Sequence, residues 1–152
     1  MNGTVMEIIK ASEISLSFLS SDFQGVPVFI CTSARRVEKK LSETGIPVLS
    51  VNRQLSKLLL EYSSEERANR VERITKDILS NKSAVIVKDF EMLFDPRYPI
   101  DVVRLFCEKA RSANVIIKWP GQYKSGTLSY AEPGQPDYHE YDCNAYVLRI
   151  VH

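Results

Sequence analysis

Hydrophobic residues along this chain form two kinds of segment that alternate. Near-continuous apolar runs, rich in β-branched residues, are typical of buried strands, and they occupy residues 26–31, 46–51, 83–90, 114–119 and 145–151. Segments whose apolar residues recur with helical spacing lie between them, at 33–44, 52–62, 63–79 and 100–110. Strands that alternate with helices predict right-handed βαβ crossovers. The pattern therefore predicts a three-layer α/β fold, with a five-stranded parallel sheet and helices on both faces.

The helix predicted over residues 33–44 has recognisable start and end signals. Thr32 or Ser33 can cap its first turn, because a hydroxyl oxygen there accepts a hydrogen bond from an unsatisfied backbone N–H. Gly45 follows the segment and suits the left-handed conformation that commonly ends a helix. A short helix between the first two strands is therefore expected.

Two further segments predict helices of different strength. Residues 63–79 open with Ser63 and Glu66, which have the spacing of a capping box. The expected buried stripe of this helix is Val71, Ile74 and Ile78. Residues 5–20 carry a looser apolar pattern, which predicts an N-terminal helix within a lead-in over residues 1–25.

Length and composition indicate one ordinary globular domain over residues 1–152. A formal net charge of +1 gives no global field that would draw the molecule onto nucleic acid or an anionic membrane. The three cysteines lie far apart and outside any C-x-x-C pair, and there are two histidines, so we expect no metal site. Charged residues interrupt the apolar opening of the chain, which argues against a signal peptide or membrane span. We expect a cytoplasmic protein without a membrane partner.

The stretch 119–144 is rich in Gly, Pro and Tyr and is too long for an ordinary connector, so we expect a long loop with a function. Its aromatic side chains favour a partner-docking surface, because Tyr and Trp supply large rigid contacts at interfaces. The docking candidates are Trp119, Pro120, Gly121, Tyr123, Tyr130, Glu132, Pro133, Gly134, Pro136 and Tyr138. Alternatively, the rings pack this excursion onto the sheet edge. Base stacking is disfavoured by the acidic residues of the stretch, so charge does not support a nucleic-acid partner.

Asp89 and Glu91 follow the most apolar run, where a P-loop enzyme carries the acid that helps to hold magnesium. An acid after a strand is a weak indication, because many such residues cap the next helix. For Asp89 considered alone, the structural role is favoured. No catalytic residue is assigned with certainty from the sequence.

The strings "VIVKDFEMLFDP", "IIKWPGQYKSGTLSYAEPGQPDYHEY" and "YVLRI" resemble BrxF, the small P-loop-type subunit of type 3 BREX phage-defence systems. With "GIPVLSVNRQLSKLLLEYSSEERANRV", the resemblance spans residues 26–151. It implies an ASCE-type (RecA-like) sheet in which the first strand, the acid-bearing strand and the strand before Trp119 are central. It also implies that the chain is a component of a larger defence complex.

The chain departs from the P-loop pattern after its first strand. No glycine occurs between Val26 and Glu43, so a G-x-x-x-x-G-K-[ST] phosphate loop cannot form there. Arg35 and Arg36 oppose the helix macrodipole, so Thr32, Ser33, Arg35 and Arg36 are candidates for an anion site, although a solvated basic face with Lys39 and Lys40 is the favoured interpretation. We expect a degenerate P-loop fold that is not an enzyme, needs no cofactor and binds other defence proteins or copies of itself. The alternative is a subunit that binds ATP with magnesium, or nucleic acid, through an unconventional phosphate site.

Overall fold

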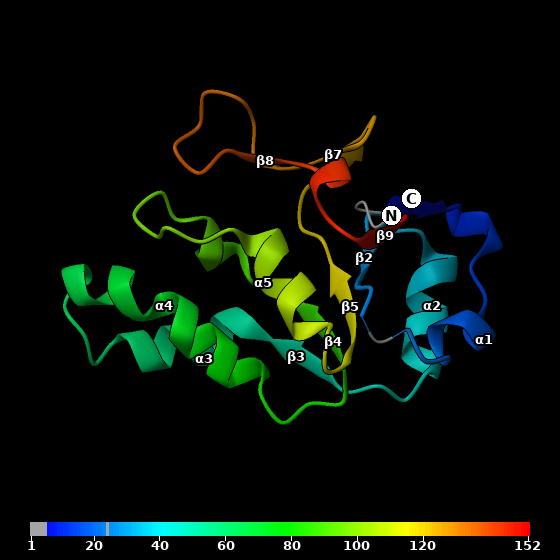
Figure 1. Ribbon diagram of the computed structural model, residues 1–152, viewed down its shortest axis with the longest axis horizontal. Helices are drawn as coiled ribbons and strands as arrows, with labels where there is room; N and C mark the ends of the chain where they lie inside the picture. The colour runs from blue at the N-terminus through cyan, green and yellow to red at the C-terminus, as the bar shows by residue number, and fades with distance from the viewer. Residues whose placement is uncertain (1–5, 24) are drawn as a thin grey trace.

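The computed structural model describes residues 6–23 and 25–152, which form a mixed α/β fold (Figure 1). The main sheet has six strands in the order β1-β9-β2-β5-β4-β3, and neighbouring strands are parallel. Its strands are β1 (Met6–Ile9), β2 (Val28–Ile30), β3 (Val48–Ser50), β4 (Ala84–Lys88), β5 (Asn114–Lys118) and β9 (Leu148–Val151). The prediction of five strands was one strand too few.

Helices cover both faces of this sheet, as the alternation of segments predicted. They are α1 (Leu16–Leu19), α2 (Arg35–Glu43), α3 (Val51–Leu59), α4 (Ser64–Leu79) and α5 (Val102–Lys109). Successive residues of a strand point to opposite faces. Accordingly, Phe29 belongs to the larger core under α3, α4 and α5, whereas Val28 and Ile30 belong to the smaller core under α1 and α2.

The N-terminal segment corrects the prediction of one helix over residues 5–20. Within the described part, strand β1 is followed by the 3-10 turn η1 (Ala11–Glu13) and the single-turn helix α1. Met6 to Ile9 pair with Leu148 to Val151, so the last strand of the chain supplies hydrogen bonds that a local pattern could not reveal. Residue 5 lies outside the described residues.

The capping signals were partly right. Ser63 Oγ accepts from the backbone N–H of Glu66 at 3.2 Å, which confirms the start of α4, and Gly45 (φ 73°) follows the end of α2. The buried stripe of α4 differs, because Thr75 is fully buried whereas Ile74 is only partly so. The buried Thr75 hydroxyl is paired, because it donates a hydrogen bond to the Val71 carbonyl at 2.7 Å.

Residues 119–144 are not one long loop. They contain a three-stranded antiparallel sheet of β6 (Gln122–Lys124), β7 (Thr127–Tyr130) and β8 (His139–Asp142). This small sheet lies beyond the carboxyl ends of the main strands, and β9 follows it through the turn η3 (Cys143–Ala145) (Figure 1). The turn η2 (Glu91–Phe94) lies between β4 and α5 in the chain.

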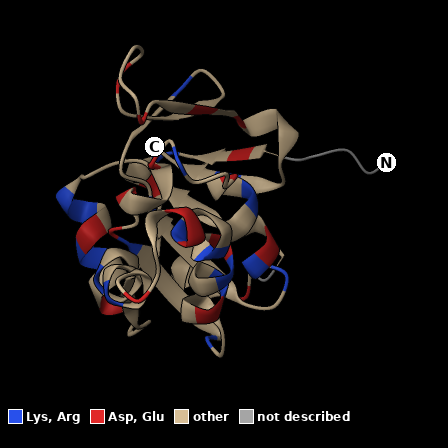
Figure 2. Cartoon of the chain, turned by 90° about the vertical axis from the view of Figure 1, so that its left-hand side faces the viewer, with Lys and Arg blue, Asp and Glu red and all other residues tan. Residues whose placement is uncertain are grey.

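Charge is interspersed over the molecule, and Figure 2 shows acidic and basic residues alternating on the helices. This distribution matches the low net charge of +1. Within residues 6–23 and 25–152, no helix combines the length and apolar character needed to cross a bilayer.

Candidate functional site at the carboxyl edge of the main sheet

The carboxyl ends of β2 and β5 form the crevice where an open α/β sheet usually binds ligands. The two strands are neighbours, and the chain leaves β2 toward β3 on one side and leaves β5 toward β9 on the other. A cavity of about 540 Å³ lies there. Its lining residues are Ile30, Cys31, Thr32, Ser33, Glu38, Lys118, Trp119, Pro120 and Gly121.

The link between β2 and α2 consists of Cys31, Thr32, Ser33 and Ala34. Ala34 occupies the N-cap position and makes no side-chain capping bond, which corrects the prediction of a Thr32 or Ser33 cap. The Thr32 hydroxyl instead accepts a hydrogen bond from the Ala34 N–H at 3.1 Å. This bond closes a tight turn immediately before the helix. This link is too short and too poor in glycine to surround a phosphate.

Glu38 and Lys118 form an ion pair across this cavity, with Lys118 Nζ 2.8 Å from Glu38 Oε1. Glu38 lies in the first turn of α2, where a carboxylate is favoured by the positive end of the helix dipole. Lys118 ends β5. The pair joins residues 80 positions apart, so no spacing along the chain predicts it, and only the sheet brings β5 next to β2.

The two arginines proposed for an anion site are not part of the cavity lining. Arg35 is exposed on α2, and Arg36 Nη2 donates to the Ile14 carbonyl at 3.3 Å. The Arg36 side chain therefore ties α2 to the segment before α1. Of the four residues in that prediction, the structure brings only Thr32 and Ser33 into the cavity.

Cys31 lines the cavity but has the properties of a buried thiol. Burial raises the pKa of Cys31 to about 12, with a smaller contribution from Cys143. A thiol with this pKa is almost entirely protonated at neutral pH and is a poor nucleophile. The raised pKa therefore gives no support to Cys31 as a nucleophile.

The acids Asp89 and Glu91 lie after β4, outside the lining of that cavity. Ser50 Oγ donates to Asp89 Oδ2 at 2.9 Å, and Asn52 Nδ2 donates to Glu91 Oε1 at 3.1 Å. The backbone is also engaged, because the Asn52 N–H donates to the Asp89 carbonyl at 2.6 Å.

These bonds attach the β3–α3 junction to the end of β4. Asp89 has φ 50°, a conformation that non-glycine residues rarely adopt and that aspartate tolerates better than most. In the described part of the chain, no group of three or more His, Cys, Asp or Glu side chains is placed to hold a metal ion. Each of the two acids thus accepts a hydrogen bond from a side chain of the β3–α3 junction.

Trp119 lies in the core and is only 6% exposed. Its ring makes edge contacts with Phe29, Phe94 and Tyr141 at centroid distances of 5.8, 5.5 and 6.0 Å. Its Nε1–H donates to the Ser129 carbonyl at 2.9 Å. A side chain on Gly121 would overlap with the same carbonyl. The W-P-G string therefore attaches the small sheet to the main sheet.

The tyrosines of this segment also make contacts within the chain. Tyr130 stacks on Phe94 at 4.2 Å between ring centroids, and burial is the main reason why its pKa is raised. Tyr123 Oη accepts from the Gly126 N–H at 3.2 Å, and Tyr138 Oη donates to Glu140 at 2.7 Å. Each ring remains partly accessible.

The residues 132–138 form two consecutive turns. The Gln135 N–H donates to the Glu132 carbonyl at 3.0 Å, and the Tyr138 N–H donates to the Gln135 carbonyl at 3.1 Å. Pro133 and Gly134 (φ 96°) fill the central positions of the first turn, as a type II turn requires. Glu132, Pro133, Gly134 and Pro136 are all exposed.

A second cavity of about 440 Å³ separates these turns from the first cavity. Pro120 and Gly121 line both cavities, so the two hollows are adjacent. The second one is also lined by Tyr130, Glu132 and Asp137. The predicted docking residues thus divide into three groups: buried Trp119, the partly buried Pro120, Gly121, Tyr123, Tyr130 and Tyr138, and the exposed turn residues Glu132, Pro133, Gly134 and Pro136.

Comparison of the chain with protein-family models, with curated proteins and with solved structures finds no match in any of the three.

Proposed function

We propose that this protein is a non-catalytic, P-loop NTPase-like subunit of a bacterial BREX-type phage-defence complex and acts through protein–protein contacts. The defence assignment rests on the resemblance of the strings around Asp89, Trp119 and Tyr130 to BrxF. The strand order supports the P-loop NTPase-like part of the proposal. In ASCE-type sheets an additional strand separates the loop-bearing strand from the acid-bearing strand, and β5 lies between β2 and β4.

One observation carries the non-catalytic part of this proposal. Where a P-loop would present backbone N–H groups, the chain has the glycine-free link Cys31–Ala34 and an ion pair between Glu38 and Lys118. A carboxylate at this place repels a nucleotide phosphate and occupies the lysine that could have bound it. Asp89 and Glu91 are held by Ser50 and Asn52 and lie outside the cavity.

Calorimetry with ATP and magnesium tests this point. We expect no saturable heat at millimolar nucleotide for the wild type. Glu38→Gln removes the repelling carboxylate and frees Lys118. This second variant therefore shows whether the ion pair is what prevents nucleotide binding. Saturable ATP binding by the wild type, weakened by Asp89→Ala, would refute the non-catalytic assignment.

The partner-binding part is supported by the accessible turns at residues 132–138 and by the partly exposed rings of Tyr130 and Tyr138. The experiment is co-purification of the tagged protein from cells that express its genomic neighbours, together with a phage-protection assay. Pro133→Ser combined with Tyr138→Ala should reduce co-purification and protection while the melting temperature stays unchanged. Lys57→Ala, at an exposed position of α3, is the matched control.

A second candidate function is favoured by the cavity itself. Thr32, Ser33 and Lys118 line about 540 Å³ at the edge where α/β proteins bind nucleotides. A subunit that binds ATP or a nucleic-acid phosphate at this unconventional site is the alternative. ATP or oligonucleotide binding that disappears with Lys118→Met would establish it in place of the first proposal.

A further inference from the structure

Helix α4 presents a polar stripe on the side opposite to the core. Val71, Thr75 and Ile78 point inward, whereas the stripe lines a groove of about 590 Å³. The groove is lined by Tyr62, Glu66, Asn69, Arg70, Arg73, Ile74 and Asp77. Apart from Tyr62, which precedes the helix, these residues lie on α4 and recur every three to four positions, so they lie along one side of it.

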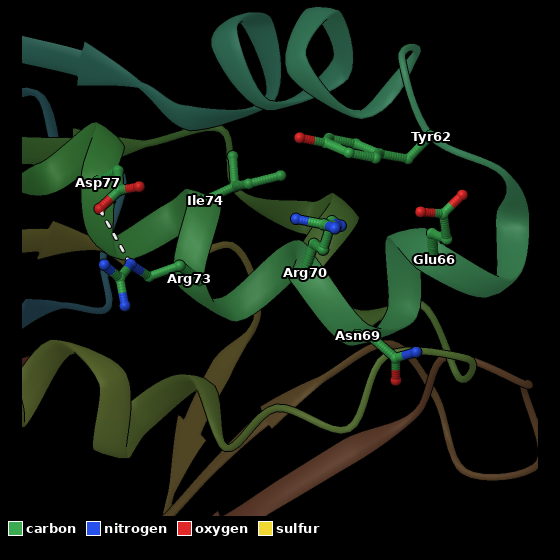
Figure 3. A pocket seen from close by; sticks show the side chains of 7 residues that line it. All are labelled: Tyr62, Glu66, Asn69, Arg70, Arg73, Ile74 and Asp77. Atoms are coloured by element: carbon green, nitrogen blue, oxygen red, sulfur yellow. Dashed lines mark ion pairs between the residues drawn. The ribbon is translucent and has the colours of Figure 1, made fainter.

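The charged groups of this groove make only exposed contacts within one copy. Figure 3 shows the Tyr62 ring and the Arg70 guanidinium near one another, with Glu66 beside them and the Arg73–Asp77 pair at the other end. Arg70 Cζ lies 4.6 Å from the centre of the Tyr62 ring. Arg73 Nε lies 3.5 Å from Asp77 Oδ1, and these two side chains are 82% and 68% exposed. Such an exposed pair holds its members weakly, so both can turn to a new partner.

The order of these residues is self-complementary when it is read in opposite directions. Asn69 and Arg70 are adjacent at the midpoint; Glu66 lies three residues before Asn69, and Arg73 lies three after Arg70. On α4, Glu66 is thus matched by Arg73, a residue of opposite charge, and Asn69 by Arg70, a hydrogen-bonding complement.

We propose that this groove binds the same face of a second copy of the chain, with the two α4 helices antiparallel about a two-fold axis between Asn69 and Arg70. The arrangement places Glu66 opposite Arg73 of the second copy. Two-fold symmetry repeats each contact. At about 1.5 Å per residue, the two Glu66–Arg73 contacts lie about 10 Å apart along the helices.

The direction of the pairing follows from the charges. A parallel arrangement would place Glu66 against Glu66 and Arg73 against Arg73, which is repulsive. The two Arg70 side chains meet near the axis, and each is drawn toward the Tyr62 ring of its own copy. Because the contacts are polar and exposed at the rim, we expect a weak dimer that dissociates as salt rises.

Sedimentation velocity over micromolar to millimolar protein tests the proposal, at about 50 mM and about 500 mM NaCl. The wild type should dimerise with concentration, and high salt should weaken the dimer. Glu66→Arg and Arg73→Glu should each raise the dissociation constant at least about tenfold, because each creates two like-charge pairs. Glu43→Arg and Lys39→Glu on α2 are the matched controls, and both should dimerise as the wild type does.

Two combinations separate a specific pairing from general repulsion. The double variant Glu66→Arg/Arg73→Glu exchanges the charges within each pair and should dimerise again. Mixing the two single variants should produce a heterodimer, because every pair is then complementary, although neither variant dimerises alone. Circular dichroism melts should confirm that all variants are folded.

The proposal is overturned by a wild type that stays monomeric at low salt up to millimolar concentration. It is equally overturned if the single variants dimerise as well as the wild type, since the dimer then uses another surface. A folded double variant that stays monomeric, with no heterodimer in the mixture, would also contradict the pairing.

Discussion

The β2–α2 link and the small antiparallel sheet meet at the same edge of the main sheet but are held by different forces. The link depends on exposed polar groups, chiefly the ion pair of Lys118 and Glu38, whose side chains are 33% and 39% exposed. The small sheet depends on buried rings, with Trp119 in contact with Phe29, Phe94 and Tyr141. The comparison indicates that substitutions in the link should cost little stability, whereas substitutions in the aromatic attachment should unfold the small sheet.

The largest effect is expected for Trp119→Ala. Removal of this buried ring should lower the free energy of unfolding by about 3–5 kcal/mol, because it leaves a cavity between the two sheets and removes the hydrogen bond from Trp119 to the Ser129 carbonyl. Urea unfolding followed by circular dichroism measures the loss. Tyr138→Ala, at the turns, should change stability by less than about 0.5 kcal/mol. Equal losses in both variants would contradict the division between buried and accessible docking residues.

Gly121→Ala should have the next largest effect. The added methyl group would overlap with the Ser129 carbonyl, so the two sheets must separate or the Trp119 hydrogen bond must lengthen. We expect a loss of about 1–3 kcal/mol in unfolding free energy. Gly126 has φ 84°, and a Cβ added there meets no atom closer than 3.8 Å. Gly126→Ala therefore measures backbone strain without overlap and is the control for Gly121→Ala. A wild-type melting temperature for Gly121→Ala would show that the attachment is loose.

Gly45→Val tests a position remote from both regions. Gly45 has φ 73° after the end of α2, and a side chain in this left-handed conformation costs about 1–2 kcal/mol. No atom lies within 4 Å of the added Cβ, so the backbone alone is responsible. Gly45→Asn should lose less, because asparagine tolerates this conformation. Thermal denaturation of the two variants gives the comparison, and identical losses would argue against the stated cause.

The smallest stability effect is expected at the ion pair. Glu38→Gln should lower the free energy of unfolding by less than about 1 kcal/mol, because both partners are partly exposed. A double-mutant cycle with Lys118→Met measures the coupling of the two side chains. A coupling of several kcal/mol would mean that the link is as firmly held as the aromatic attachment and would remove the contrast between the two regions.

Signals that depend on near neighbours predicted much of the fold. The alternation of apolar runs and helical segments predicted β2, β3, β4, β5 and β9 in the main sheet with helices on both faces. The Ser63–Glu66 capping box and Gly45 marked helix ends correctly, because such bonds are made within one turn. Strand β1 was missed because it pairs with β9 at the other end of the chain. The β6–β7 hairpin is local, and its turn residues Ser125 and Gly126 are a signal that was interpreted as part of a loop.

The amino-acid sequence alone therefore determined the α/β class, the central strands and the absence of a glycine loop, because periodicity and residue identity are local properties. Only the tertiary structure decided how the functional candidates are arranged. It paired Lys118 with Glu38, placed Trp119 in the core and separated Asp89 and Glu91 from the cavity at Thr32. These outcomes depend on the order of strands in the sheet, which brings together residues that no spacing along the chain relates.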